Sequence, residues 1–175
     1  NMGEIGGDLI PLGMASLAAY VREKSFGVGV LDCPTLKINN EDVYEIIVQK
    51  NPAIIGFSTT TYALSKAIEL AKKIRSKLPN KLTVIGGSHA NVAGIETANQ
   101  YDVFDIIAYG LDGEYILHEI VQKYFNSRIE KHCSRMNARC ESSSQQCALC
   151  QEHRFPMIQP GGAGKTTQNT VNMTI

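Results

Sequence analysis

The sequence predicts an α/β fold with a doubly wound parallel sheet, and three features of the chain lead to this prediction. Apolar strand-like runs alternate with helical patterns from residue 11 to residue 125. The strand-like runs end in loops of glycine, hydroxyl or other polar residues. The chain has 175 residues, of which 43% are hydrophobic, and this is enough for the core of one ordinary domain and a tail.

The clearest strand is the run Ala53–Thr61, a short apolar segment after Pro52 that stops in a polar loop. Further strands are expected at Val28–Leu31, Leu82–Ile85 and Val103–Tyr109. Helices are expected where apolar residues recur at intervals of three and four or where start and stop signals occur. These segments are Pro11 to Lys24, Asn40 to the Asn51-Pro52 pair, Tyr62–Leu78, Ile95–Asn99 and Tyr115–Phe125.

The first strand of such a sheet would be central, yet no strand pattern precedes Pro11. We expect residues 1–126 to form the α/β domain and residues 127–175 to form a polar, cysteine-containing tail. The tail lacks sustained apolar periodicity, so we expect it to be partly disordered or to contribute a strand. Its segment 154–160 resembles the strand that opens such domains, so the first strand is either missing or supplied by the C-terminal segment.

Composition excludes several classes of partner. Seventeen basic and seventeen acidic residues cancel, which removes the electrostatic case for nucleic acid or an anionic membrane. No apolar run suits a membrane span, and no signal-peptide pattern opens the chain. We therefore expect a cytoplasmic protein with reduced cysteines. The start at Asn1 suggests a fragment or a trimmed chain.

Four loops should meet along one edge of the sheet, because the carboxyl ends of parallel strands lie together and ligands of open sheets bind there. Small and hydroxyl residues let a large ligand approach the backbone, and helix starts offer N–H groups to it. The same residue types also make ordinary turns and helix caps. The loops are Asp32-Cys33, Ser58–Thr61, Gly86–His89 and Gly110–Glu114.

Five segments in order resemble the cobalamin-binding domain that stands N-terminal in many radical S-adenosylmethionine enzymes. They are PLGMASLAAYVRE (Pro11–Glu23), VLD (Val30–Asp32), IIGFSTTT (Ile54–Thr61), VIGGSHA (Val84–Ala90) and YGLDGEY (Tyr109–Tyr115), within residues 3–125. The resemblance implies a flavodoxin-like sheet with cobalamin over its carboxyl edge and the nucleotide tail in a cleft near Ser58 and Gly86-Gly87. The implied cofactor-binding residues are Pro11, Leu12, Gly13, Asp32, Cys33, Ser58, Thr59, Thr60, Gly86, Gly87, His89, Gly110, Gly113 and Glu114.

One loop departs from the wider cobalamin-binding pattern, Asp-x-His-x-x-Gly, whose histidine binds cobalt from below. Here Pro34 stands at the histidine position and Lys37 at the glycine position. The resemblance therefore implies base-off cobalamin without a lower histidine ligand. Cys33 could approach the lower face, but a structural thiol is the expected alternative. His89 could either donate to the ligand or cap a helix.

The resemblance also implies a catalytic radical domain, in cis or in trans, that holds S-adenosylmethionine and an iron–sulfur cluster and carries out methyl transfer or related chemistry. The family holds this cluster with Cys-x-x-x-Cys-x-x-Cys. The tail has Cys140, Cys147 and Cys150 at a different spacing. We therefore expect this chain not to be catalytic by itself.

Two tail motifs leave other options open. Cys140, Cys147, Cys150 and His153 are weak metal-binding candidates. The run Gly161–Thr167 resembles a phosphate-binding loop, but the helix and sheet that such a loop needs do not follow it. The rival hypothesis is a non-catalytic α/β nucleotide-binding or protein-interaction module. A hydrolase or transferase ranks third, since the sequence offers no legible nucleophile–base pair.

Overall fold

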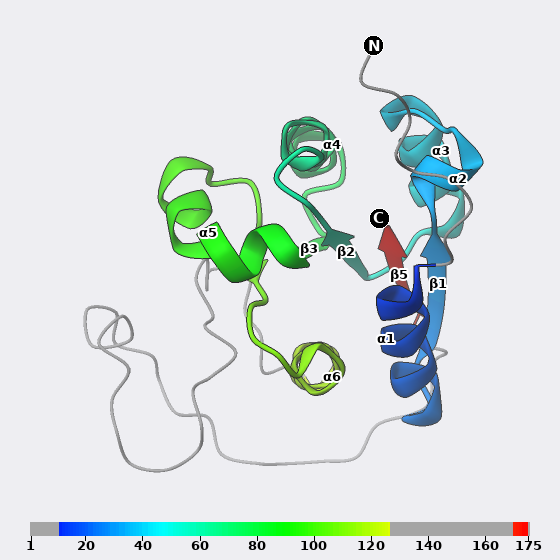
Figure 1. Cartoon of the computed structure of the whole chain (residues 1–175). Coiled ribbons are helices and arrows are strands. Elements are labelled where there is room, and N and C mark those ends of the chain that lie inside the picture. The colour runs from blue at the N-terminus through cyan, green and yellow to red at the C-terminus, as the bar shows by residue number, and fades with distance from the viewer. Residues whose placement is uncertain (1–10, 127–169, 175) are drawn as a thin grey trace.

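The computed structural model describes residues 11–126 and 170–174. These residues form a parallel five-stranded sheet with helices on both faces (Figure 1). The strands are β1 (Gly27–Leu31), β2 (Ile54–Ser58), β3 (Leu82–Gly86), β4 (Ile106–Ile107) and β5 (Thr170–Thr174). The helices are α1 (Leu12–Glu23), α2 (Cys33–Leu36), α3 (Asn40–Lys50), α4 (Leu64–Lys77), α5 (Ser88–Gln100) and α6 (Gly113–Phe125).

The strand order β1-β5-β2-β3-β4 confirms the expected flavodoxin-like sheet. In that fold the first strand lies between the second and the third, and here β5 takes this place. Val171 pairs with Val28 of β1 on one side and with Ile54 of β2 on the other. The central strand thus comes from the C-terminal end of the chain. The segment 154–160, which we expected in this role, lies outside the described residues.

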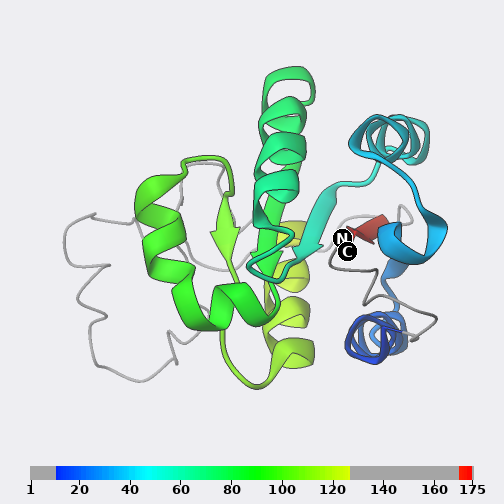
Figure 2. The ribbon, with the colours of Figure 1, turned by 45° about the horizontal axis from the view of Figure 1, so that its top comes forward.

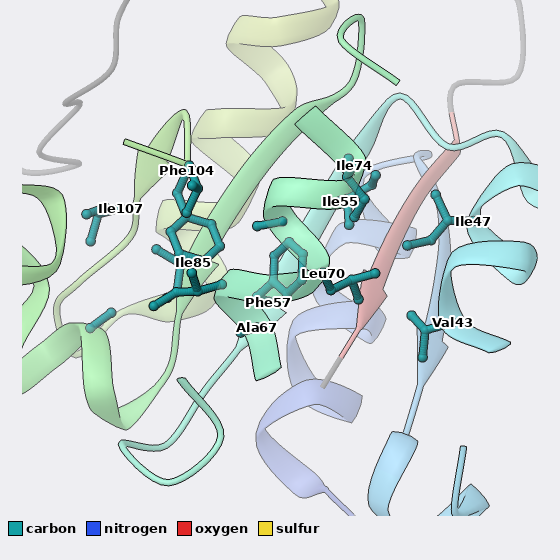
Figure 3. Packing of buried hydrophobic residues seen from close by; sticks show 14 residues of the cluster. Val43, Ile47, Ile55, Phe57, Ala67, Leu70, Ile74, Ile85, Phe104 and Ile107 are labelled. Atoms are coloured by element: carbon teal, nitrogen blue, oxygen red, sulfur yellow. The ribbon is translucent and has the colours of Figure 1, made fainter. Parts of the chain in front are cut away.

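Two apolar clusters hold the helices on the sheet. Helices α1 and α6 cover one face, and α3, α4 and α5 cover the other (Figures 1 and 2). Successive residues of β2 serve opposite faces, since Ile54 belongs to the α1–α6 cluster and Ile55 to the other. Figure 3 shows the second cluster, in which the rings of Phe57 and Phe104 meet edge to face at 5.5 Å between centroids.

Strand β4 is shorter than the run Val103–Tyr109 that the sequence predicts. The backbone N–H of Thr83 donates to the Asp105 carboxylate at 2.8 Å, so a side chain occupies a donor that a strand partner would use. Val103 and Phe104 are buried in the core nevertheless. Their apolar pattern therefore reports burial and not strand pairing.

Helix α5 begins earlier than the predicted Ile95–Asn99. It starts at Ser88 and bends at Ala93, whose dihedral angles of −134° and 28° are not helical. Figure 2 shows the two pieces of α5 meeting at an angle. The first piece carries little apolar periodicity, so the sequence pattern marks only the second. Among the described residues, no helix is long and apolar enough to cross a membrane.

Candidate cofactor-binding site

Two cavities open at the carboxyl ends of the strands. The first, called here the glycine-lined cavity, has a volume of about 350 Å³ and lies between α1, α6 and the ends of β2 and β3. The second, the α3–α4 cavity, has a volume of about 1000 Å³ and is lined by residues of α2, α3 and α4. Ser58 lines both cavities. Both volumes fall within the range of roughly 300–1,000 Å³ that small-molecule sites occupy.

Most of the sequence-predicted residues line these cavities. The glycine-lined cavity is bordered by seven of them, namely Gly13, Ser58, Gly86, Gly87, Gly110, Gly113 and Glu114. The α3–α4 cavity is bordered by Cys33, Ser58, Thr59 and Thr60. Pro11, Leu12, Asp32 and His89 line neither cavity.

The two glycines that follow β3 meet different surroundings. A Cβ atom on Gly86 would have the Ala108 carbonyl oxygen as its nearest neighbour at 3.4 Å, an ordinary contact. A Cβ atom on Gly87 would lie 2.7 Å from the Thr59 nitrogen, and its φ of +89° also favours glycine. Gly87 is therefore required by the close approach of the β2–α4 loop, whereas Gly86 leaves space at the cavity wall.

The other glycines of the site also differ from one another. Gly13 lies in the first turn of α1, and nothing stands within 4 Å of the position of an added Cβ atom. Gly110 has a φ of +137°, and its N–H donates to the Asn91 side-chain oxygen at 2.9 Å. An added Cβ on Gly113 would touch Leu17 of α1 at 3.4 Å. Space for a ligand thus exists at Gly13 on α1 and at Gly86 on β3.

The β2–α4 loop begins with Thr59, whose backbone and side chain both form hydrogen bonds within the fold. Thr59 is buried, its N–H donates to the Gly86 carbonyl at 3.0 Å, and its carbonyl accepts from the His89 N–H at 3.0 Å. Its hydroxyl also lies 3.4 Å from the Gly86 carbonyl oxygen. The next residue, Thr60, is exposed.

His89 is a buried residue of the fold. Its ring nitrogens lie 3.1 Å and 2.7 Å from the hydroxyls of Thr61 and Thr97. Both nitrogens therefore have protein partners in the ligand-free chain, and no side chain caps α5. The expected contact of His89 with the ligand stays a prediction.

The Asp32-Cys33 segment forms a single helical turn, α2, where the sequence predicts a loop. The Asp32 carboxylate caps it by accepting from the Thr35 N–H at 3.2 Å. Lys37 ends it with a φ of 52°, the left-handed conformation that favours glycine, at the position where the family motif has glycine. Burial, together with the neighbouring Asp32 charge, raises the pKa of the Cys33 thiol to about 11.

Glu114 connects the two helices that flank the glycine-lined cavity. The Ser16 hydroxyl of α1 donates to the Glu114 carboxylate of α6 at 2.6 Å. This hydrogen bond lowers the pKa of the carboxyl group, and a backbone hydrogen bond contributes in the same direction. Glu114 therefore remains an acceptor at neutral pH, directed at Ser16.

The sequence did not single out two residues that hold the site together. Asn91 positions Gly110, and Ser16 positions Glu114. Asn91 lies two residues after His89, and a helix predicted to start at Ser88 would have brought it to the sheet edge. Ser16 lies in the predicted first helix, where a polar residue indicates only that the position is exposed to solvent.

No group of three or more metal-ligating side chains occurs in the part of the chain that the structure describes. The weak metal candidates Cys140, Cys147, Cys150 and His153 lie outside that part, as does the run Gly161–Thr167.

The chain belongs to the B12-binding domain family, because the family model matches residues 1–120. B12 is cobalamin, so the resemblance inferred from the sequence is confirmed. The chain is 30% identical over 118 residues to an uncharacterized methyltransferase of Pyrococcus horikoshii. It is 29% identical over 122 residues to the anaerobic magnesium-protoporphyrin IX monomethyl ester cyclase of Rubrivivax gelatinosus.

These relatives are much longer proteins. The aligned part is 67% of this chain in both comparisons, but it is only 25% of the methyltransferase and 21% of the cyclase. A second cyclase of that name, from Cereibacter sphaeroides, is 26% identical over 69% of this chain and 20% of its own length. No solved structure matches the chain.

Proposed function

We propose that this chain holds base-off cobalamin over the carboxyl edge of its sheet for the catalytic domain of a radical S-adenosylmethionine enzyme. The main support for this proposal is that Ser58, Gly86 and Gly87 line the same cavity. The chain also belongs to the B12-binding domain family. Bound cobalamin would take part in methyl transfer or related chemistry, and the catalytic domain would hold S-adenosylmethionine and an iron–sulfur cluster and carry that chemistry out.

The residues of the glycine-lined cavity suit the nucleotide tail of the corrin. Gly13 and Gly86 both line this cavity, and neither has a side chain that would take up its volume. The lining also includes the apolar side chains of Val84, Ile116 and Leu117, which suit a flat aromatic base. Ser58 at the cavity wall offers a hydroxyl to the polar atoms of the tail.

The α2 turn supplies no lower histidine ligand for cobalt. Pro34 has no side-chain atom that can bind cobalt, and Lys37 ends the turn in the place of the motif's glycine. Burial raises the pKa of the Cys33 thiol to about 11, so this thiol is protonated at neutral pH in the ligand-free chain. We therefore assign no lower cobalt ligand to this loop.

The exposed apolar side chains near the site favour the proposal that a large ligand and a partner domain cover this surface. Leu12, Tyr62 and Leu111 are 75%, 94% and 91% exposed. Leu12 is the first residue of α1, and Tyr62 and Leu111 lie in the loops that lead into α4 and α6. Burying such side chains is favourable by about 1.5–3 kcal/mol each.

A corrin-retention experiment tests the proposal. The chain is mixed with hydroxocobalamin, reduced to the cob(II)alamin state, and desalted, and the visible spectrum is recorded. We expect one corrin per chain with a base-off spectrum. A folded protein that retains no corrin would favour the rival hypothesis of a protein-interaction module, and a base-on spectrum would refute placement of the tail in the glycine-lined cavity.

A further inference from the structure

The buried imidazole of His89 joins two elements that lie far apart in the sequence. The residue is 6% exposed. Its Nδ1 atom lies 3.1 Å from the Thr61 hydroxyl in the β2–α4 loop. Its Nε2 atom lies 2.7 Å from the Thr97 hydroxyl in the second piece of α5. A side chain with a partner at each nitrogen can transmit order from one element to the other.

The hydrogen bonds around the ring have a direction. The Thr97 hydroxyl donates its hydrogen to the Ala93 carbonyl at 2.7 Å, so its oxygen must accept from the His89 Nε2–H. In the neutral ring Nδ1 then carries no hydrogen and accepts from the Thr61 hydroxyl. The network thus assigns the Nε2–H tautomer, and the loop is held through Nδ1.

The Thr61 contact matters because the backbone holds only the start of the loop. The N–H and carbonyl of Thr59 are bonded to Gly86 and His89. After Thr59 the chain turns outward: the Ala63 N–H donates to the Thr60 carbonyl within the loop, and Tyr62 is exposed. The Thr61–His89 hydrogen bond therefore ties the outward half of the loop to α5, next to the Thr60 side of the cavity.

The chain of hydrogen bonds that runs from Thr61 through His89 and Thr97 ends at the bend of α5. Thr97 bonds to Ala93, the residue with non-helical dihedral angles that separates the first turn of α5 from the rest. That first turn also carries Asn91, whose side chain holds Gly110 on the other side of the site. One short turn thus orders two loops that line the two cavities.

We propose that His89 is a positioning residue for the ligand: the hydrogen bond that its Nδ1 atom accepts from Thr61 fixes the β2–α4 loop in its ligand-binding position. Only the identity of the ligand, cobalamin, rests on the function proposed above. The order of the loop is a property of the unliganded chain.

Matched variants separate this role from a general contribution to stability. Thr61→Val removes the hydroxyl and keeps the branched shape, whereas Thr61→Ser keeps the hydroxyl. At position 89, an asparagine side chain places a polar atom near the position of Nδ1, and a glutamine near that of Nε2. His89→Asn therefore retains a partner for Thr61, and His89→Gln retains one for Thr97.

The readout is amide hydrogen exchange at Ala63, measured by NMR without ligand, and Thr59, which backbone hydrogen bonds hold, is the internal reference. We expect Thr61→Val and His89→Gln to speed exchange by about tenfold, the effect of losing one hydrogen bond. Thr61→Ser and His89→Asn should stay within about threefold of the wild type. Wild-type exchange in Thr61→Val, or equal acceleration in the two His89 variants, would overturn the proposal. If the His89 variants do not fold, the Thr61 pair decides by itself.

Cobalamin titration of the same variants provides the second arm. Thr61→Val should weaken binding by about fivefold to tenfold, and Thr61→Ser by less than about twofold. Equal affinities for the two Thr61 variants would overturn the ligand-positioning role. A wild-type chain that binds no cobalamin would refute the proposed function, whereas the exchange data would still decide whether His89 orders the loop.

Discussion

The two adjacent glycines after β3 offer a clear separation of ligand binding from folding. In Gly86→Ala the new methyl group has an ordinary contact at 3.4 Å with the Ala108 carbonyl oxygen. Gly86 and Ala108 both line the glycine-lined cavity, so the methyl group would lie at the wall against which we propose that the nucleotide tail binds. In Gly87→Ala the methyl group would lie 2.7 Å and 2.9 Å from backbone atoms of Thr59, at a φ of +89°.

These distances set the expected magnitudes. Gly86→Ala should change the free energy of unfolding by less than about 1 kcal/mol, since alanine fits and restricts the unfolded chain. It should weaken cobalamin binding by about 1–3 kcal/mol, the usual cost of overpacking, or roughly fivefold to 150-fold in Kd. Gly87→Ala should cost at least about 1–3 kcal/mol of stability before any ligand is added.

Urea unfolding of the ligand-free variants measures stability, and an absorbance titration with cobalamin measures affinity. Wild-type affinity in Gly86→Ala would refute the placement of the tail against Gly86. Equal loss of stability in the two variants would refute our reading of the contacts around β3.

Three further predictions follow from individual residues. Gly13→Ala places a methyl group in open space within a helix, so thermal unfolding should show a gain of about 0.5–1 kcal/mol together with weaker cobalamin binding; a loss of stability would contradict the open geometry. Cys33, with its pKa raised from 9.0 to about 11, should react with iodoacetamide about a hundredfold more slowly near pH 8 than an unperturbed thiol, as mass spectrometry of its peptide would show. The raised pKa also makes the fold more stable below about pH 9, and this contribution is lost as the pH rises toward 11. A normal alkylation rate would contradict the burial of the thiol. Lys37→Gly should stabilise the chain by up to about 1 kcal/mol in urea unfolding, because φ at this position is 52°, and a loss of stability would show that the lysine side chain makes a compensating contact.

The sequence predicted the layers of the fold because apolar periodicity reports burial directly. The helical stripe of Leu64–Lys77 and the buried run of β2 are unambiguous in this respect. The same signal misled at Val103 and Phe104, which are buried without being in a strand. The central strand β5 follows a stretch of polar tail, and its pairing with β1 and β2 depends on contacts that no local pattern encodes.

The site was predictable where a loop residue faces a cavity and not where it supports another residue. Ser58 and the glycines follow strand ends, so the topology alone brings them to the cavity. The orientation of His89 into the fold depends on hydroxyls at Thr61 and Thr97, which the sequence does not associate with it. Supporting residues such as Asn91 became visible only through their hydrogen bonds.

The central claim is that the glycine-lined cavity receives the nucleotide tail of cobalamin. Its most direct test compares the affinities of the chain for cobalamin and for cobinamide, the corrin that lacks the nucleotide. Burial of the aromatic base predicts that cobalamin binds at least about tenfold more tightly than cobinamide. Moreover, Gly86→Ala should reduce this ratio by weakening cobalamin binding alone. Equal affinities for the two corrins in the wild-type chain would contradict the account.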